Sequence, residues 1–370
     1  MNRTSLSAPI AAVVSVAAAL FLSPAPLVGQ APKAAAPRMA ASQPAAPTAA
    51  TPAAATVKAA APKAAARTWT PPRTSWGDPD LQGAWRNNAN TPLERLSDER
   101  MAAFRKQLLH EKERAEKNDG YYEKGTPSDR TSMIIDPPDG KIPPLSAEGQ
   151  RRAAAREEAN SKRKGIYDVE RGWRAADTWE DRDLWERCIT RGVPNSMIPH
   201  SFSNHYNILQ TQGYVAIQYE IVHDVRIIPL DGRPHLSRGV RQWMGDSRGR
   251  WEGNTLVVDV TNFHPMIVHQ REAGLPITKY RGTGETQHVI ERFTRVDADT
   301  IDYRFTIEDP TTYARPWTAS IPLERRDEFR DQMHEFACHE GNVRGMLGIL
   351  KGARVEEAEE AAAAAKKKTN

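Results

Sequence analysis

The sequence predicts a mainly antiparallel β protein with a helical and extended N-terminal part. After residue 204, apolar and polar residues alternate with a period of two, and turn-forming residues recur every 8–15 residues. Before that point, two stretches show helical spacing instead. The chain has 370 residues, 39% of them hydrophobic, which is enough for one large or two small domains.

The N-terminus has the features of a secretory signal peptide. Arg3 supplies a positive start, residues 11–22 are apolar, and small residues surround Gly29. The apolar run is shorter than the roughly 20 residues that span a bilayer. We therefore expect residues 1–30 to be cleaved rather than to anchor the chain. The mature protein is expected in the periplasm or the medium, without a transmembrane segment.

Residues 31–67 are almost wholly Ala, Pro, Thr and Lys, which predicts a disordered cationic tether. The tether is either a spacer or a tolerated low-complexity leader. Residues 1–77 contain seven cations and no acid, so removing these seven from the 51 Lys and Arg leaves 44 cations against 47 acids. The positive net charge comes from this leader, and we expect no nucleic-acid partner.

Residues 68–200 are predicted to form an arm packed on the strands that follow. The arm starts near Trp76–Trp85, where Gly, Pro and Asp form a turn. Helices are expected over residues 97–117, with Ser97 as N-cap, and over residues 147–163, after Ser146. Gly192 and Pro194 are expected to end a short helix around Trp185.

Residues 201–345 are predicted to form the β domain. The expected strands are Tyr214–Glu220, His223–Leu230, Arg250–Trp251, Thr255–Val260, His288–Arg295, Thr300–Glu308, Trp317–Glu324 and Met333–Cys338. Strands in this order form a meander that closes into a barrel or folds into a sandwich. Residues 346–370 are expected to be a helical or disordered tail, in which acids precede lysines as the helix dipole favours.

The two cysteines, Cys188 and Cys338, are the only ones in the chain. The predicted export places them in an oxidising compartment, where a disulfide would join the Trp-rich segment to the last predicted strand. Two buried free thiols, or a reactive one, are the alternatives. Neither cysteine belongs to a Cys-x-x-Cys pair, so a redox-exchange role is weakly supported.

Nine of the ten histidines lie between residues 200 and 339, where several strands could bring imidazoles together. Such convergence is typical of acid–base and metal sites, although a hydrogen-bonded structural histidine is the alternative for each. His223 lies beside Asp224, and His288 lies near Glu291, so carboxylates could fix their tautomers. The candidate catalytic residues are His223, His288, Arg226 and Arg241.

Arginines and acids surround Trp243 and Trp251, which predicts either a clamp for a carboxylate or sugar, or a rim of ion pairs. The candidate ligand contacts are His205, Tyr219, Trp243, Asp246, Trp251, Glu291 and His334. There is no Gly-x-Gly-x-x-Gly, P-loop or Gly-x-Ser-x-Gly motif. The sequence therefore identifies no cofactor or metal.

Several motifs resemble a family of uncharacterised exported bacterial proteins of soil acidobacteria and some proteobacteria. They are Trp76–Trp85, Thr91–Arg95, Asp136–Gly140, Arg187–Gly192, Gly249–Asp259 and Cys338–Asn342. The resemblance covers about residues 68–356 and implies export and one structural unit, but it carries over no catalytic residue. The hairpins are similar in pattern to lipocalin-like barrels, and we expect a calycin-like barrel.

Three functions are compatible with these features. The leading hypothesis is an exported small-molecule-binding protein with a β-barrel pocket. The second is a periplasmic lyase, isomerase or hydrolase that uses His and Arg acid–base chemistry, with or without a metal. The third is an envelope structural protein whose tether matters more than its pocket.

Overall fold

The computed structural model describes residues 69–87, 90–106, 129–161, 184–199, 203–269, 285–326 and 333–369. The chain divides between Ala64 and Ala65, and all described residues belong to the second unit. The predicted signal peptide and tether lie outside the described residues.

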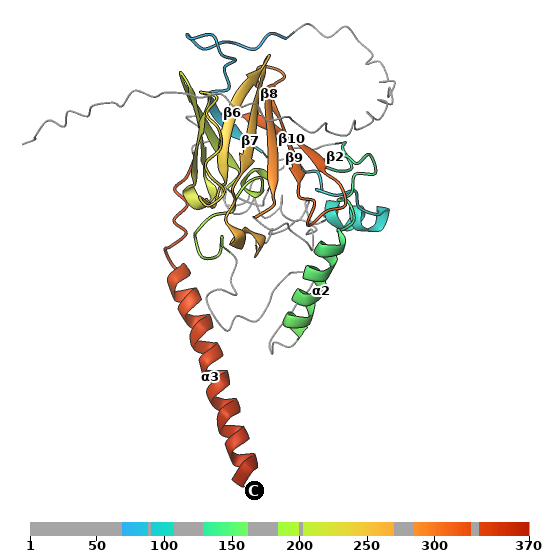
Figure 1. Ribbon diagram of the computed structural model, residues 1–370, viewed down its shortest axis with the longest axis vertical. Helices are drawn as coiled ribbons and strands as arrows, with labels where there is room; N and C mark the ends of the chain where they lie inside the picture. The colour runs from blue at the N-terminus through green and yellow to red at the C-terminus, as the bar shows by residue number, and fades with distance from the viewer. Residues whose placement is uncertain are drawn as a thin grey trace, which may run out of the picture. The chain divides into compact units, whose positions relative to one another are not determined.

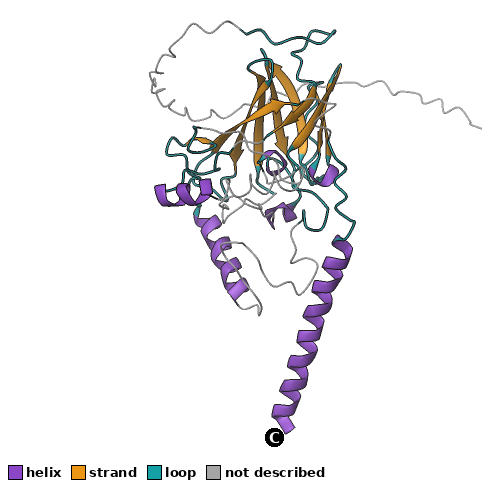
Figure 2. Ribbon diagram, turned by 180° about the vertical axis from the view of Figure 1, so that it is seen from behind, coloured by secondary structure: helices purple, strands orange, loops and turns teal. Residues whose placement is uncertain are grey.

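The second unit is built on one antiparallel sheet that curls into a nearly closed, barrel-shaped structure (Figures 1 and 2). The strands are β1 (Gly83–Arg86), β2 (Ile134–Asp136), β3 (His205–Thr211), β4 (Tyr214–Tyr219), β5 (Val225–Pro229), β6 (Asp246–Glu252), β7 (Thr255–Thr261), β8 (His288–Arg295), β9 (Thr300–Glu308) and β10 (Trp317–Arg325). Nine of them follow the order β5-β4-β3-β1-β10-β9-β8-β7-β6, and β2 pairs with β10. This confirms the predicted β-barrel of calycin-like type.

The barrel has a seam between β5 and β6, the two ends of the strand order. Each strand is antiparallel to its hydrogen-bonded neighbours. Eight such neighbouring pairs separate β5 from β6 in the strand order, so these two strands run in the same direction. Parallel strands need a long connection, and residues 230–245 provide it. Side chains close the seam, because a Cβ on Gly249 of β6 would lie 2.5 Å from Leu230 Cδ2 and 2.8 Å from Ile228 Cγ2. Only glycine lets the β5 side chains pack this closely against β6.

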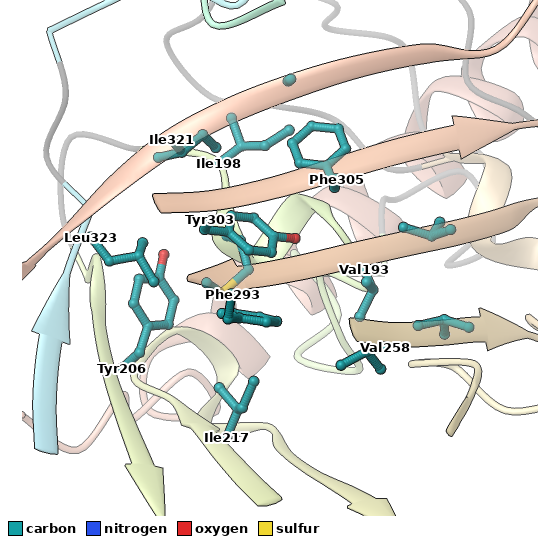
Figure 3. Close-up of a cluster of buried hydrophobic side chains, with 14 of the residues drawn as sticks. Val193, Ile198, Tyr206, Ile217, Val258, Phe293, Tyr303, Phe305, Ile321 and Leu323 are labelled. Carbon is teal, nitrogen blue, oxygen red and sulfur yellow. The ribbon is translucent and has the colours of Figure 1, made fainter. Parts of the chain in front are cut away.

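Inward-facing apolar side chains form a core cluster inside the barrel (Figure 3). Alternation along β9 places Tyr303 and Phe305 inside, and Phe293 of β8 packs against Tyr303 with ring centroids 4.8 Å apart. Residues 184–199 close one end, where Val193 and Ile198 join the same core (Figure 3). The predicted arm therefore contributes to the core of the barrel, and β1 enters the sheet between β3 and β10.

Two helices start after the predicted capping residues Ser97 and Ser146, but the short helix predicted around Trp185 is wrong, because residues 184–188 form turns. Ser146 Oγ accepts a bond of 3.0 Å from Gly149 N at the start of α2 (Ala147–Ser161). Residues 98–106 are helical after Ser97, and the rest of that predicted helix lies outside the described residues. The tail forms α3 (Asn342–Thr369), and single-turn helices are η2 (Asn195–Met197), η3 (Ile221–His223) and η4 (Pro265–His269). Within the described ranges, no helix is both long and apolar enough to cross a membrane.

The predicted strand Met333–Cys338 is wrong, because residues 333–337 have no regular structure and a turn follows. This segment is held by a disulfide and by hydrogen bonds to other loops, so its local alternation has no partner strand. The sequence interpretation also omitted β1, β2 and β3. One of the inward positions of β3 carries the polar residue Gln210, which interrupts the apolar alternation. Its Oε1 accepts a hydrogen bond of 2.6 Å from Leu81 N.

Replacing Gly249 with valine tests the closure of the seam. The new side chain would overlap Leu230 and Ile228, so we expect the free energy of unfolding to fall by about 1–3 kcal/mol, the usual cost of overpacking. Urea unfolding followed by tryptophan fluorescence measures it. Gly239→Ala is the control, because Gly239 is exposed with open space around its Cβ position. Equal stabilities for the two variants would contradict the seam packing.

Candidate functional site

Four buried side chains meet inside the barrel, and we call them the lumen cluster: Tyr219 of β4, Arg226 of β5, Glu291 of β8 and Tyr303 of β9. Arg226 Nη1 donates to Glu291 Oε2 at 2.6 Å, and Nη2 donates to Oε1 at 3.1 Å. The Tyr303 hydroxyl donates to Glu291 Oε1 at 2.9 Å. The bidentate ion pair thus joins β5, at the seam, to β8 on the other side of it.

Strand alternation places these four residues inside. Tyr219 ends β4 with its side chain on the same face as Val215 and Ile217, and Glu291 lies between two buried residues of β8 at a spacing of two. The Arg226 guanidinium carbon lies 6.0 Å from the centroid of the Tyr219 ring. A cation at this distance from an aromatic face is attracted to it.

Burial and mutual charge determine the protonation of the lumen cluster. Burial raises the pKa of Tyr219 well above its usual value, and burial together with the Glu291 charge does the same for the pKa of Tyr303. Burial alone would lower the pKa of Arg226, but the charge and hydrogen bonds of Glu291, together with Tyr219 and Tyr303, outweigh it and raise that pKa. Both phenols are therefore neutral, and the guanidinium stays charged.

Four polar atoms near the seam have no hydrogen-bond partner among the residues that the structure describes. They are Arg226 Nε, Tyr219 Oη, Ser247 Oγ and Trp251 Nε1. Ser247 precedes Gly249 by two residues on β6, so it faces the interior, and it is 4% exposed. A buried polar atom without a hydrogen-bond partner destabilises the folded state, and such atoms are rare in natural proteins. These atoms are hydrogen-bonding groups that the described residues leave unused beside the lumen cluster.

A second network runs along the outer face of the barrel, and we call it the outer chain: Asp246, His235, Asp259, His288 and Glu308. His235 Nδ1 faces Asp246 Oδ2 at 2.9 Å, and its Nε2 faces Asp259 Oδ1 at 2.8 Å. His288 Nε2 faces Asp259 Oδ2 at 3.0 Å, and its Nδ1 faces Glu308 Oε2 at 2.9 Å. Both nitrogens of each ring face carboxylates, and in His288 a doubly protonated ring can donate both bonds.

The outer chain fastens the connection across the seam. His235 belongs to residues 230–245, and Asp246 and Asp259 lie on β6 and β7. Leu236 N also donates to Asp246 Oδ2 at 2.8 Å. The bond to Asp259 raises the pKa of His288 despite partial burial, and Glu308 adds to the effect. In turn, the bond from His288 lowers the pKa of Asp259.

A third group lies at the end of the barrel that carries the disulfide. Cys188 and Cys338 are bonded, which confirms the predicted bridge. Glu220, 5% exposed, accepts from His205 Nδ1 at 2.8 Å and from His334 N at 3.0 Å. Burial would raise the pKa of Glu220, but these hydrogen bonds outweigh it and lower that pKa.

The backbone at this end is strained, since the non-glycine residues Cys188, Val222 and His223 have φ values of 56°, 57° and 46°. His223 Nδ1 lies 3.2 Å from Phe336 O, and Thr190 Oγ1 donates to Asp224 Oδ2 at 2.7 Å. These bonds tie the η3 turn to the two segments that the disulfide joins.

The structure brings three of the predicted site residues together, namely Tyr219, Arg226 and Glu291. His223 and His288 lie in separate networks, and Arg241 Nη1 donates to the carbonyl oxygen of Glu285 at 3.2 Å. The catalytic roles predicted for these residues stay predictions.

The other predicted ligand contacts are dispersed. Trp243 stacks on His264 with centroids 4.0 Å apart, and Trp251 packs against the core. Asp246 is 3% exposed and pairs with Arg248 Nη1 at 2.8 Å as well as with His235. The arrangement at these residues matches the predicted rim of ion pairs more closely than a ligand clamp.

Sequence reasoning missed Tyr303 and Ser247 at the lumen, and His235 and Asp259 at the outer chain. Alternation places Tyr303 on the buried face of its strand, but only the folded barrel brings it to Glu291. Among the described residues, no group of three or more His, Cys, Asp or Glu side chains could hold a metal ion.

Comparison with known proteins found no match for this chain among protein-family models, curated proteins or solved structures. The motif resemblance to exported bacterial proteins therefore stays an expectation. The functional argument rests on the chemistry of the lumen cluster and its surroundings.

The outer chain predicts how stability depends on pH. Because the pKa of His288 is raised in the folded protein, its contribution to stability is complete below about pH 6.5, the ordinary pKa of histidine. The contribution is lost as the pH rises through the pKa of His288 in the folded protein. The lowered pKa of Asp259 means that its contribution is complete above about pH 3.9 and is lost in acid. From the usual strength of hydrogen bonds to charged groups, we expect His288→Gln to lower the free energy of unfolding by about 1–2 kcal/mol between these two pH limits.

Urea unfolding from pH 4 to pH 9 measures this cost. The difference between wild type and His288→Gln should shrink toward pH 9, where the imidazole loses its second proton. His339→Gln is the matched control, because His339 is exposed and outside the outer chain. A difference that grows as the pH rises would refute the doubly protonated ring.

The disulfide predicts a large loss of stability on its removal. It joins residues 150 positions apart, so it strongly restricts the unfolded chain. We expect Cys188→Ala with Cys338→Ala to lower the free energy of unfolding by about 2–4 kcal/mol. Unfolding of wild type in dithiothreitol should match that of the double variant, whose own stability should not respond to the reductant. A reductant effect on the double variant would show that another group is responsible.

Proposed function

We propose that this chain is an exported small-molecule-binding protein whose ligand occupies the barrel interior beside the lumen cluster. The observation that carries this proposal is the set of buried polar atoms without partners, above all Arg226 Nε and Tyr219 Oη. They lie on side chains that are 3% and 0% exposed, in the interior of a nearly closed barrel. The interior of a small barrel is a recurrent position for one small ligand.

The seam offers a route to this position. β5 carries Arg226, β6 carries Ser247, and backbone hydrogen bonds do not hold the two strands together. Separating them costs the side-chain contacts at Gly249 and the bonds of His235 to Asp246 and Asp259, but no ladder hydrogen bonds. A ligand can therefore reach the lumen cluster by a local movement of residues 225–252, with the rest of the sheet intact.

Binding is better supported than acid–base catalysis. His288 and His235 lie on the outer face, and each uses both ring nitrogens in contacts with carboxylates. The groups at the lumen are a guanidinium, a paired carboxylate and two phenols of raised pKa, which hold their protons at neutral pH. Such groups orient a ligand by hydrogen bonds without exchanging protons with it.

Export is part of the proposal. The apolar leader of residues 11–22 and the motif resemblance support it. The Cys188–Cys338 disulfide also supports it, because such bonds persist in the periplasm and outside the cell.

Native mass spectrometry tests the proposal. The sample is the protein expressed from its full-length gene and recovered after export by its own host. We expect the native mass to exceed the denatured mass by the mass of an organic molecule. Tyr219→Phe, prepared in the same way, should retain less of the adduct because one hydrogen-bonding group is lost. A native mass equal to the denatured mass, together with a leader retained in full, would contradict the proposed function.

Two tyrosine variants separate recognition from stability. Tyr303→Phe removes a hydrogen bond to a buried carboxylate, so the free energy of unfolding should fall by about 1.5–3 kcal/mol. Tyr219→Phe removes a hydroxyl without a partner among the described residues, so stability should be unchanged or higher. Thermal unfolding of the ligand-free proteins measures both. An equal loss in the two variants would show that the Tyr219 hydroxyl has a structural partner.

A further inference from the structure

The chemistry of the lumen cluster restricts the charge of its ligand. Arg226 and Glu291 carry one charge of each sign and neutralise each other through two hydrogen bonds. Tyr219 and Tyr303 are neutral phenols. The cluster therefore has no net charge, and a charged ligand group would enter a buried space without a counterion. Burying an unpaired charge is strongly unfavourable, so the structure favours an uncharged ligand.

The remaining hydrogen-bonding capacity restricts the ligand further. Glu291 Oε1 already accepts two bonds, and Oε2 accepts one. The Nε atom of an arginine can only donate, so the ligand atom that faces Arg226 Nε must be an acceptor. The Tyr219 hydroxyl, on the ring 6.0 Å from the guanidinium carbon, supplies a second donor. A single oxygen with two lone pairs can accept from both.

The surroundings of the lumen cluster are apolar. Phe293 stacks against Tyr303, and Ile217 and Val258 project into the same interior (Figure 3). Tyr206 meets Tyr219 edge to face, with centroids 5.7 Å apart. Apart from its acceptor and any group that reaches Ser247 Oγ, a ligand here loses water contacts without gaining polar ones, so most of the molecule must be hydrophobic.

We propose that the ligand is an uncharged, largely apolar molecule with a carbonyl-type oxygen, which accepts hydrogen bonds from Arg226 Nε and Tyr219 Oη. This inference rests on the proposed function and adds the chemical class of the ligand. Ketones, esters and amides fit this class. Carboxylates, sulfonates and amines do not, because each carries a charge that the paired Arg226 and Glu291 leave uncompensated.

Three probes of nearly equal size test the class: 2-acetylnaphthalene, 2-naphthoate and 2-ethylnaphthalene. Saturation-transfer NMR and titration calorimetry on the full-length protein measure their dissociation constants at pH 7. We expect the ketone to bind about tenfold more tightly than the hydrocarbon, and the carboxylate to bind no better than the hydrocarbon. Tyr219→Phe should weaken ketone binding about fivefold and leave the hydrocarbon unchanged.

The control variant is Tyr214→Phe, which removes an exposed hydroxyl from the outer face of the same strand, β4, outside the lumen cluster. It should preserve the preference of the ketone over the hydrocarbon. Naphthoate binding as tight as ketone binding would overturn the uncharged class, and so would a ketone preference that survives Tyr219→Phe. In either case the proposed binding function would stand. If none of the three probes binds and the exported protein shows no organic adduct, the proposed function itself fails.

Discussion

The closure of the barrel between two parallel strands is the constraint on which the other features depend. Nine strands in an antiparallel path bring β5 and β6 together with the same direction and without ladder hydrogen bonds. Side chains must then replace the missing backbone bonds. Gly249 allows Ile228 and Leu230 to pack against β6, and the Arg226–Glu291 pair joins β5 to β8 across the interior. The lumen cluster therefore lies beside the weakest line of the sheet.

A buried ion pair is an expensive way to close a barrel, because desolvation of both charges offsets most of their attraction. Well-packed apolar residues would serve closure equally well. The retention of Arg226, Glu291 and two tyrosines in the interior is more readily explained by recognition. The pair holds the guanidinium in a fixed orientation, which leaves Nε and the Tyr219 hydroxyl available to a ligand.

Local patterns predict the long strands β8 and β9, although the inward positions of β8 include the charged residue Glu291. Alternation predicts β8 and β9 with the bounds that the structure has. It does not reveal β1, which has only four residues, or β3, whose inward Gln210 interrupts the pattern. It also predicts a strand at Met333–Cys338, where a disulfide and loop contacts determine the conformation.

The site likewise depends partly on local sequence patterns and partly on contacts that only the folded barrel creates. Charged and aromatic residues on strands mark Arg226, Tyr219 and Glu291 as candidates, but their meeting depends on a closure that joins residues 65 positions apart. The clustering of histidines in the sequence predicts catalytic imidazoles. In the fold, however, His288 lies on the outer face of β8, where carboxylates contact both of its ring nitrogens. Closure thus separates two kinds of polar group. The titratable imidazoles fasten the connection outside the barrel, and the groups that hold their protons remain inside, where a ligand needs donors of constant charge.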